Sequence, residues 1–240
     1  MTLSSFRSLV RGRQQLPHAE HPEIRRMIGY RDSCAPAEVS FPAAALGDAL
    51  VARWLRDRRV AVDVRTLAEL HSAISVGIHP VLMTVHADQL NVGDIRRASA
   101  AGVGRVVLSR PEQITPLRAK QTQNVLLRMT DAATNYSDIA ADAVIACRST
   151  TLIGLLCDIG TCGDDVVGCP AAIGNMIAQM DHIRRRHNIV LTRLILGVSN
   201  TEAAAGNSIR RRDLAEEIDE SVVDACATLR FPRPAIVMAA

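Results

Sequence analysis

Short apolar runs alternate with helical patterns along the whole chain. The clearest run occupies residues 152–163, where continuous apolar residues break at the carboxyl end into Asp158, Thr161 and two glycines. Such a run predicts a strand buried on both faces, followed by a loop where chemistry can take place. Strands that alternate with helices in this way predict a parallel sheet.

The same pattern predicts eight strands, with seven helices between them and one helix before the first strand. The expected strands are 38–45, 60–64, 81–85, 105–108, 124–129, 152–159, 192–196 and 235–240. The expected helices are 21–30, 46–58, 66–77, 92–101, one that starts at Pro111, 137–148, 171–187 and 214–229. Right-handed crossovers close this order into a (β/α)8 TIM barrel, while an open doubly wound sheet fits it less well.

Three helix ends carry local signals. Thr66 stands as an N-cap with Glu69 three residues later, which is the spacing of a capping box. Gly77 follows the same helix as a C-cap glycine, and Gly102 ends the next helix. Pro111 fits the first turn of a helix, where its missing N–H costs no hydrogen bond.

The length and composition suit one large α/β domain. The chain has 240 residues, 48% of them hydrophobic but only 2% aromatic, so we expect a core of Ala, Val, Leu and Ile. Residues 21–240 form the expected domain. Residues 1–20 are expected to be a flexible basic arm, because residues 1–16 carry three arginines, no acid and no long apolar stretch. We therefore expect no secretory signal or membrane segment. An organelle-targeting segment is one interpretation of these basic residues, but a flexible arm of a cytoplasmic, bacterial protein fits them better.

The basic residues do not form one stripe. They occur in small groups separated by acids, for example at 56–59, 184–186 and 210–212, and the net charge is only +3. Such groups are typical of solvated helix faces. The shortage of aromatic residues also leaves few platforms for stacking bases, so nucleic-acid binding is unlikely.

The six cysteines contain no Cys-x-x-Cys pair and lack the density of a disulfide scaffold. They are expected to be mostly reduced core residues. A zinc site could be proposed from residue type alone, with Cys157, Cys162, Cys169 and His182 as ligands. The spacing of these residues matches no standard zinc pattern. We therefore expect no metal site.

In a barrel of this kind, function lies at the carboxyl ends of the strands. The residues predicted to stand there are Ala43, Ala44, Arg65, His86 to Asp88, Ser109, Arg128, Asp158 to Thr161, residues 197–200 and Ala240.

The residues of several predicted strands resemble one family in order and spacing. The runs at 37–46, 51–55, 62–70, 102–107 and 152–161 look like the barrel domain of the diaminopimelate decarboxylases. These are pyridoxal-phosphate enzymes with the alanine-racemase-like barrel, and the resemblance extends over residues 35–200. The resemblance implies that this chain has the alanine-racemase-like barrel fold and is related to lyases of amino-acid metabolism. It also implies pyridoxal phosphate as the cofactor and a dimeric state.

The position of the catalytic lysine departs from the family. The first strand of these enzymes reads Tyr-Ala-x-Lys-Ala, and its lysine forms a Schiff base with the cofactor; in this chain the position is Ala44. Lys120 is the only lysine, against 27 arginines, and it is expected at the opposite face of the barrel. Arginine stays protonated and cannot replace lysine as a nucleophilic amine.

Other cofactor motifs depart as well. The motif His-Gly-Asn-Asn-Lys of the third strand keeps only His86, and the sixth strand, 156–161, has lost both family histidines. The triple glycine that approaches the cofactor phosphate is Gly197-Val198-Ser199 here, which weakens phosphate binding. The remaining, weak candidates for cofactor binding are Arg128, Gly160, Thr161, Gly197 and Ser199. The sequence ends at Ala240, before the family's Glu-Pro-Gly-Arg segment, so that segment and the second domain are expected to be absent.

These losses predict a pseudoenzyme that keeps the barrel and acts as a binding, regulatory or partner module. Its expected partners are a second copy of the chain, an active decarboxylase relative, or a small phosphorylated ligand. One alternative is an enzyme with altered chemistry, in which Asp63, His86, Asp88 and Asp158 converge with Arg128 at the barrel mouth. Others are a residual pyridoxal-phosphate decarboxylase of lysine biosynthesis and a gene remnant. Each of these residues also has a purely structural interpretation. Asp63 can orient the neighbouring backbone or Arg65, and His86 can be a rim residue whose hydrogen bonds are satisfied within the protein. Asp158 can simply face solvent.

Overall fold

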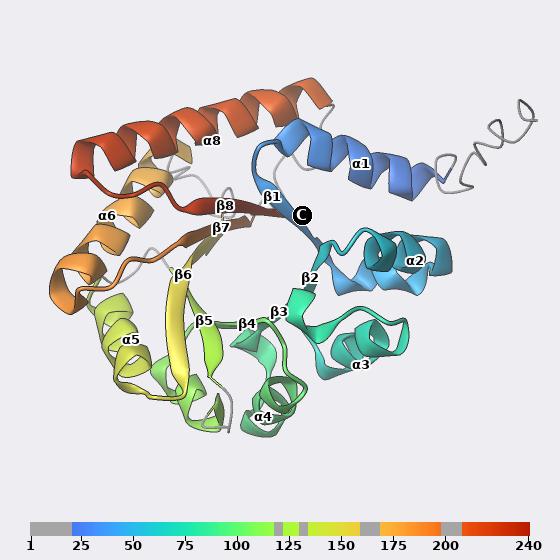
Figure 1. The fold of residues 1–240 in the computed structure, drawn as a ribbon, viewed down its shortest axis with the longest axis horizontal. Helices are drawn as coiled ribbons and strands as arrows, with labels where there is room; N and C mark the ends of the chain where they lie inside the picture. The colour runs from blue at the N-terminus through green and yellow to red at the C-terminus, as the bar shows by residue number, and fades with distance from the viewer. Residues whose placement is uncertain (1–20, 118–121, 130–133, 159–168, 198–207) are drawn as a thin grey trace, which may run out of the picture.

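The strands form a closed parallel barrel. The structure is a computed structural model and describes residues 21–117, 122–129, 134–158, 169–197 and 208–240. Within these residues, eight strands pair in chain order and the last pairs with the first, as the ring in Figure 1 shows. The strands are β1 (Glu38–Pro42), β2 (Ala61–Val64), β3 (Met83–His86), β4 (Arg105–Leu108), β5 (Gln123–Arg128), β6 (Thr150–Asp158), β7 (Arg193–Gly197) and β8 (Ala235–Ala239). The predicted (β/α)8 TIM barrel is confirmed.

Helices surround the ring of strands (Figure 1). The α-helices are α1 (Pro22–Cys34), α2 (Ala49–Asp57), α3 (Leu67–Ser75), α4 (Val92–Ala100), α5 (Thr134–Ala146), α6 (Cys169–His187) and α8 (Ser208–Leu229). Short 3₁₀ helices are η2 (Ala43–Gly47), η3 (Pro80–Leu82), η4 (Ala87–Gln89) and η5 (Pro111–Leu117). The first helix of the chain, α1, packs beside the last one, α8, over β1 and β8.

The predicted end signals of α3 and α4 are confirmed. The Thr66 hydroxyl accepts a hydrogen bond from the Glu69 N–H at 3.1 Å, and Glu69 in turn accepts from the Arg65 N–H at 2.7 Å. Gly77 and Gly102 follow the two helices at φ of +86° and +75°, the left-handed region that favours glycine.

Three predicted elements are wrong in part. The strand expected at 38–45 ends at Pro42, and Ala43–Gly47 forms the 3₁₀ helix η2 instead. Proline has no N–H to continue the sheet, and the alanines after it have little preference for strands. The helix expected from residue 46 therefore begins at Ala49, where Asp48 caps it by accepting from the N–H groups of Leu50 and Val51. The helix expected from Pro111 is the 3₁₀ helix η5.

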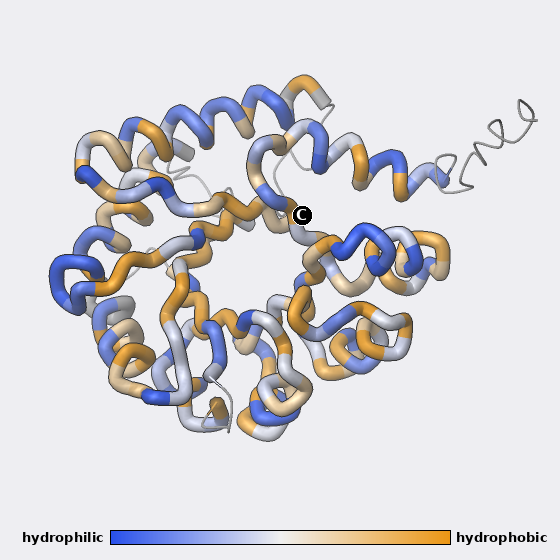
Figure 2. Tube along the Cα trace, in the orientation of Figure 1, coloured by the Kyte–Doolittle hydropathy of each residue, from blue (hydrophilic) through white to orange (hydrophobic). Residues whose placement is uncertain are grey.

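Two apolar layers hold the barrel together. The larger lies between strands and helices and is built mainly from Val, Leu, Ile, Met and Ala; Figure 2 shows apolar stretches along the strands. A small second cluster consists of Val107, Leu126, Leu156, Ile195 and Val237. Along their strands, these residues alternate with residues of the larger cluster. Because successive strand side chains point to opposite faces, this cluster fills the middle of the barrel interior. The two ends of the interior are polar, and they are described next.

Candidate functional site

The carboxyl ends of the strands bring the predicted polar residues together. Asp63 lies in β2, His86 ends β3, Arg128 ends β5 and Asp158 ends β6. Asp88 follows in η4, directly after His86. Parallel strands place their carboxyl ends at one end of a barrel, and this is why residues far apart in the sequence meet there. The predicted convergence at the barrel mouth is confirmed.

Asp63 is the most deeply placed acid of this group. Its side chain is only 8% exposed, and its carboxylate accepts a hydrogen bond from the Ser40 hydroxyl of β1. The other carboxylate oxygen lies 3.3 Å from Nε2 of His86. The expectation that Asp63 orients Arg65 is wrong, because its partners are Ser40 and His86 and Arg65 is exposed.

The hydrogen bonds of His86 define its tautomer. Its Nδ1 lies 2.9 Å from Nη2 of Arg128, and an arginine nitrogen can only donate. Nδ1 therefore accepts and carries no proton, so Nε2 carries the proton and donates to Asp63. His86 is a neutral imidazole in this arrangement, and both of its ring nitrogens are occupied.

Arg128 connects His86 to two further acids. Its Nη1 donates to the carboxylate of Asp158, and its Nη2 lies 3.0 Å from Oδ2 of Asp88. The Arg128 side chain is 16% exposed, and its buried Nε has no hydrogen-bond partner in the described part of the chain. Asp158 is thus paired with Arg128 and does not simply face solvent. We call Ser40, Asp63, His86, Arg128, Asp88 and Asp158 the mouth network.

Gly197 makes room for one member of this network. A Cβ atom at Gly197 would collide with Oδ1 of Asp158, on the neighbouring strand. The glycine was predicted to approach a cofactor phosphate, but its open side is occupied by a carboxylate. A negative charge at that place disfavours a phosphate group.

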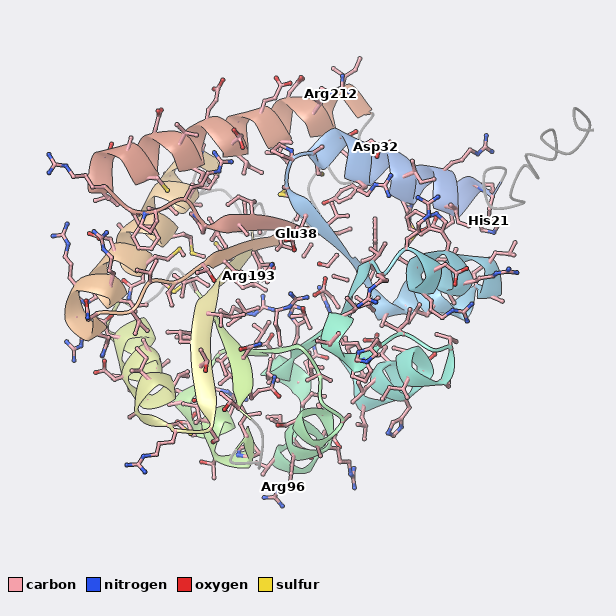
Figure 3. The ribbon with its side chains drawn as sticks, in the orientation of Figure 1. His21, Asp32, Glu38, Arg96, Arg193 and Arg212 are labelled. Carbon is pink, nitrogen blue, oxygen red and sulfur yellow. The ribbon has the colours of Figure 1, made fainter. Side chains whose placement is uncertain are left out.

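The opposite end of the interior carries the reverse charge pattern. Arg105 donates from Nε to the Thr84 hydroxyl at 2.9 Å, and Arg193 pairs with Glu38 at 3.0 Å. Figure 3 labels Glu38 and Arg193 beside the ring of strands. Burial, and after it the nearby charge of Arg193, lowers the pKa of Arg105 from its ordinary value. We call Thr84, Arg105, Arg193 and Glu38 the floor group.

The sequence prediction missed Ser40 and the floor group. The sequence did contain one indication of them. Polar residues within otherwise apolar predicted strands point to a polar barrel interior, and Ser40, Thr84 and Arg105 are such residues, as is the predicted site residue Asp63. Ser109 instead turns back locally, donating its N–H to the Gln113 side chain at 2.8 Å. Gly160, Thr161, Ser199 and Lys120 lie outside the described residues, as does the predicted arm at 1–20.

The described residues show neither a metal-binding cluster nor a membrane-spanning helix. No group of three His, Cys, Asp or Glu side chains within the described ranges is placed to hold a metal ion. Of the zinc set considered above, Cys162 lies outside the described residues, and His182 lies 3.4 Å from Asp138. No helix in the described ranges is both long enough and apolar enough to cross a membrane.

Comparison with known proteins identifies the family of this barrel. Residues 23–238 match the family model of the pyridoxal-dependent decarboxylase, pyridoxal binding domain. The chain belongs to this family. It is 30% identical over 190 residues to a diaminopimelate decarboxylase of Actinosynnema pretiosum subsp. auranticum, a match that covers 65% of this chain and 44% of that protein.

A second relative and a solved structure are also similar to this chain. The diaminopimelate decarboxylase of Mycobacterium tuberculosis is 32% identical over 99 residues, which are 39% of this chain and 22% of that protein. The crystal structure of the diaminopimelate decarboxylase of M. jannaschii superposes with a TM-score of 0.73 at 12% identity, covering 90% of this chain and 57% of that one. The chain thus spans about half the length of its relatives or less.

The described residues do not fit a covalently held pyridoxal cofactor. Ala44, which the resemblance places at the Schiff-base lysine, lies exposed in η2 and offers only a methyl group. The described ranges hold no lysine at all, because Lys120 lies outside them. At the mouth, three carboxylates stand against one guanidinium, and Arg128 is held by Asp158, Asp88 and His86. The charge and the missing amine both disfavour a phosphorylated aldehyde there.

Proposed function

We propose that this chain is a catalytically inactive member of the decarboxylase family, which keeps the barrel and acts as a binding or regulatory partner of another protein. The observation that carries the proposal is Ala44 at the position of the Schiff-base lysine. A family reaction that depends on an amine at this point has no nucleophile there.

The mouth network supports the same conclusion. A general acid or base must be free to exchange a proton with a substrate. His86 uses one ring nitrogen to donate to Asp63 and the other to accept from Arg128. Arg128 in turn is shared among Asp158, Asp88 and His86. Apart from Nε of Arg128, these polar groups satisfy one another, as in a structural network.

A second candidate is an enzyme that uses the same cluster for acid–base chemistry. The convergence of Asp63, His86, Asp88 and Asp158 favours it, and the side chains of Asp88 and Asp158 are each 32% exposed. Such an enzyme would first have to break the pairs with Arg128. For this reason we rank it below the binding module.

The proposed partner is a second copy of the chain or an active decarboxylase of the same family. The relatives named above are diaminopimelate decarboxylases, and the proposal keeps the dimerisation that the family resemblance implies but not the reaction. Light scattering on the chain alone, and mixed with an active relative, tests this step. A dimer or a mixed complex is expected, and monomers in both samples would contradict the partner role.

The test of inactivity is a decarboxylation assay. The purified chain is supplied with pyridoxal phosphate and, separately, with diaminopimelate, lysine or ornithine, and released carbon dioxide is measured. The diaminopimelate decarboxylase of M. tuberculosis, assayed alongside, is the positive control. We expect no release above the protein-free background, and turnover of any of these substrates would overturn the proposal.

A further inference from the structure

The two arginines of the floor group have terminal nitrogens that no other described residue uses. Arg105 makes one side-chain hydrogen bond within the described residues, from Nε to the Thr84 hydroxyl. Arg193 makes one ion pair there, from Nη1 to Glu38 at 3.0 Å. No nitrogen of either arginine is among the buried, unpartnered side-chain atoms of these residues, so the unused nitrogens reach solvent. A guanidinium group carries five N–H donors, and most of them are therefore free to bind a ligand.

Both arginines lie on the interior face of the barrel. Along β4, Arg105 alternates with Val106 of the larger apolar layer and shares its face with Val107 of the interior cluster. In β7, Arg193 shares its face with Ile195 of the same cluster. Burial, and after it the charge of Arg193, lowers the pKa of Arg105. The two guanidinium groups are therefore close enough to repel each other.

Small residues occupy neighbouring interior positions at this end. Ala61 stands two residues before the interior residue Asp63 in β2. Ala235 stands two residues before Val237 of the interior cluster in β8. Alternation puts both alanines on the interior face, where their methyl groups leave space beside the guanidinium groups. The Glu38 side chain is 58% exposed, so solvent reaches this space.

The charges at this end favour an anion. The floor group carries two guanidinium groups against one carboxylate, that of Glu38. The charge of Asp63 also acts on Arg105, but that carboxylate is already held by Ser40 and His86. Two neighbouring guanidinium groups with a single shared counter-charge repel each other, and a bound anion offsets this repulsion.

The directions of the two arginines indicate the shape of the anion. Arg105 and Arg193 come from β4 and β7, which are not neighbours in the ring, so their guanidinium groups approach from different sides. A planar carboxylate matches one guanidinium fork, as Glu38 does with Arg193. A tetrahedral oxyanion presents oxygens in several directions and can accept from two forks together.

We propose that the floor group binds a small tetrahedral oxyanion of the phosphate class, which bridges Arg105 and Arg193 and competes with Glu38 for Arg193. This site lies at the opposite end of the barrel from Gly197, where the family resemblance places a cofactor phosphate. It is independent of the proposed partner role, because it concerns neither Ala44 nor the mouth network.

The test uses inorganic phosphate as the probe and acetate as its planar match, with binding to the whole chain followed by calorimetry at constant ionic strength. Phosphate is expected to bind about tenfold more tightly than acetate, because it makes charged hydrogen bonds to a second arginine. Arg193→Gln is expected to weaken phosphate binding about tenfold. Arg186→Gln is the matched control, because Arg186 is also ion-paired, with Asp142 at 2.8 Å, but lies outside the floor group. It is expected to leave phosphate binding unchanged.

A change at Glu38 is expected to act in the opposite direction. Glu38→Gln removes the competing carboxylate, and phosphate is expected to bind about threefold more tightly to this variant. Thermal unfolding of each variant confirms that it is folded. Absent phosphate binding, equal binding of acetate, equal effects of Arg193→Gln and Arg186→Gln, or weaker binding to Glu38→Gln would overturn the site. The readout is binding of an inorganic ion, so failure here leaves the decarboxylation and light-scattering results untouched.

Discussion

The two ends of the barrel interior are both polar but are built differently. The mouth network joins three carboxylates through His86 and a single guanidinium, that of Arg128. The floor group has two guanidinium groups, those of Arg105 and Arg193, and one carboxylate, that of Glu38. The apolar cluster around Leu126 and Leu156 comes from β4 to β8, whereas Asp63 of the mouth network and Thr84 of the floor group are register partners on β2 and β3. The charge of the interior therefore changes sign from one end to the other.

Burial sets the energetic weight of each end. At the mouth, the side chains of Asp63 and His86 are 8% and 7% exposed. At the floor, Glu38 is 58% exposed, so water can replace its partner. A buried group that loses its partner stays unpaired, while an exposed one is rehydrated. The mouth network therefore contributes more to stability than the floor group, although it lies where this fold places its chemistry.

The largest expected difference in stability between the two ends comes from replacing one arginine at each end with methionine. Arg128→Met leaves Asp158, Asp88 and His86 facing each other without their shared cation, and we expect a loss of about 3 kcal/mol in the free energy of unfolding. Arg193→Met is the same chemical change at the floor, and we expect a loss of about 0.5 kcal/mol because its partner Glu38 is exposed. Urea unfolding measures both, and equal losses would contradict the comparison.

Replacing a glycine at each end with alanine gives the next largest difference in unfolding free energy. Here the larger loss is expected at the floor and the smaller one at the mouth. A Cβ at Gly154 would collide with the backbone carbonyl of Arg193, so Gly154→Ala must move a strand, and we expect a loss of about 3 kcal/mol. A Cβ at Gly197 would meet only the Asp158 side chain, which can rotate. We expect about 1 kcal/mol for Gly197→Ala. A larger loss for Gly197→Ala would mean that Asp158 is fixed more firmly than its exposure suggests.

Removing one hydroxyl at each end has a smaller effect. Ser40→Ala deprives buried Asp63 of a hydrogen bond, and we expect a loss of about 2 kcal/mol in unfolding free energy. Thr84→Val removes the acceptor of Arg105 but keeps the side-chain shape, and we expect about 1 kcal/mol. Thermal unfolding of the two variants ranks them, and the opposite ranking would show that the floor group is the better ordered.

The smallest effect is expected outside the barrel interior and serves as a reference for both ends. Hydrogen bonds from the Val51 and Leu50 N–H groups lower the pKa of Asp48 from its ordinary value. The stability from this cap is present above the unfolded-state pKa of about 4 and is lost as the pH falls through the lower folded-state value. Asp48→Asn keeps a capping side chain that does not titrate. Its unfolding free energy is expected to fall less between pH 5 and pH 2 than that of the unchanged protein. Parallel curves would contradict this role.

The order of the elements could be predicted because burial leaves a periodic mark in the sequence. Continuous apolar strands such as Arg105–Leu108 appear with the predicted bounds. The end of β1 could not be placed, because Phe41-Pro-Ala-Ala-Ala reads as an apolar run and only the chain geometry at Pro42 shows where the sheet stops.

The site could be predicted by residue type but not by partner. Strand ends bring Asp63, His86, Arg128 and Asp158 to one end, and that much follows from topology. Their pairing depends on the barrel register, which places Ser40 and His86 on opposite sides of Asp63. The packing of α1 against α8 could not be predicted, because no local pattern in the sequence encodes a contact between helices so far apart in the chain.

The inactivity of this chain follows most directly from the absence of a Schiff-base amine at residue 44. The decisive measurement is reaction of the whole chain with pyridoxal phosphate, reduction with borohydride, and mapping of any covalent adduct by peptide mass. We expect no stoichiometric adduct in the unchanged protein. We expect an adduct at residue 44 in Ala44→Lys, which shows that an amine at this exposed position is detected. A stoichiometric adduct at one site of the unchanged protein would contradict the proposed inactivity.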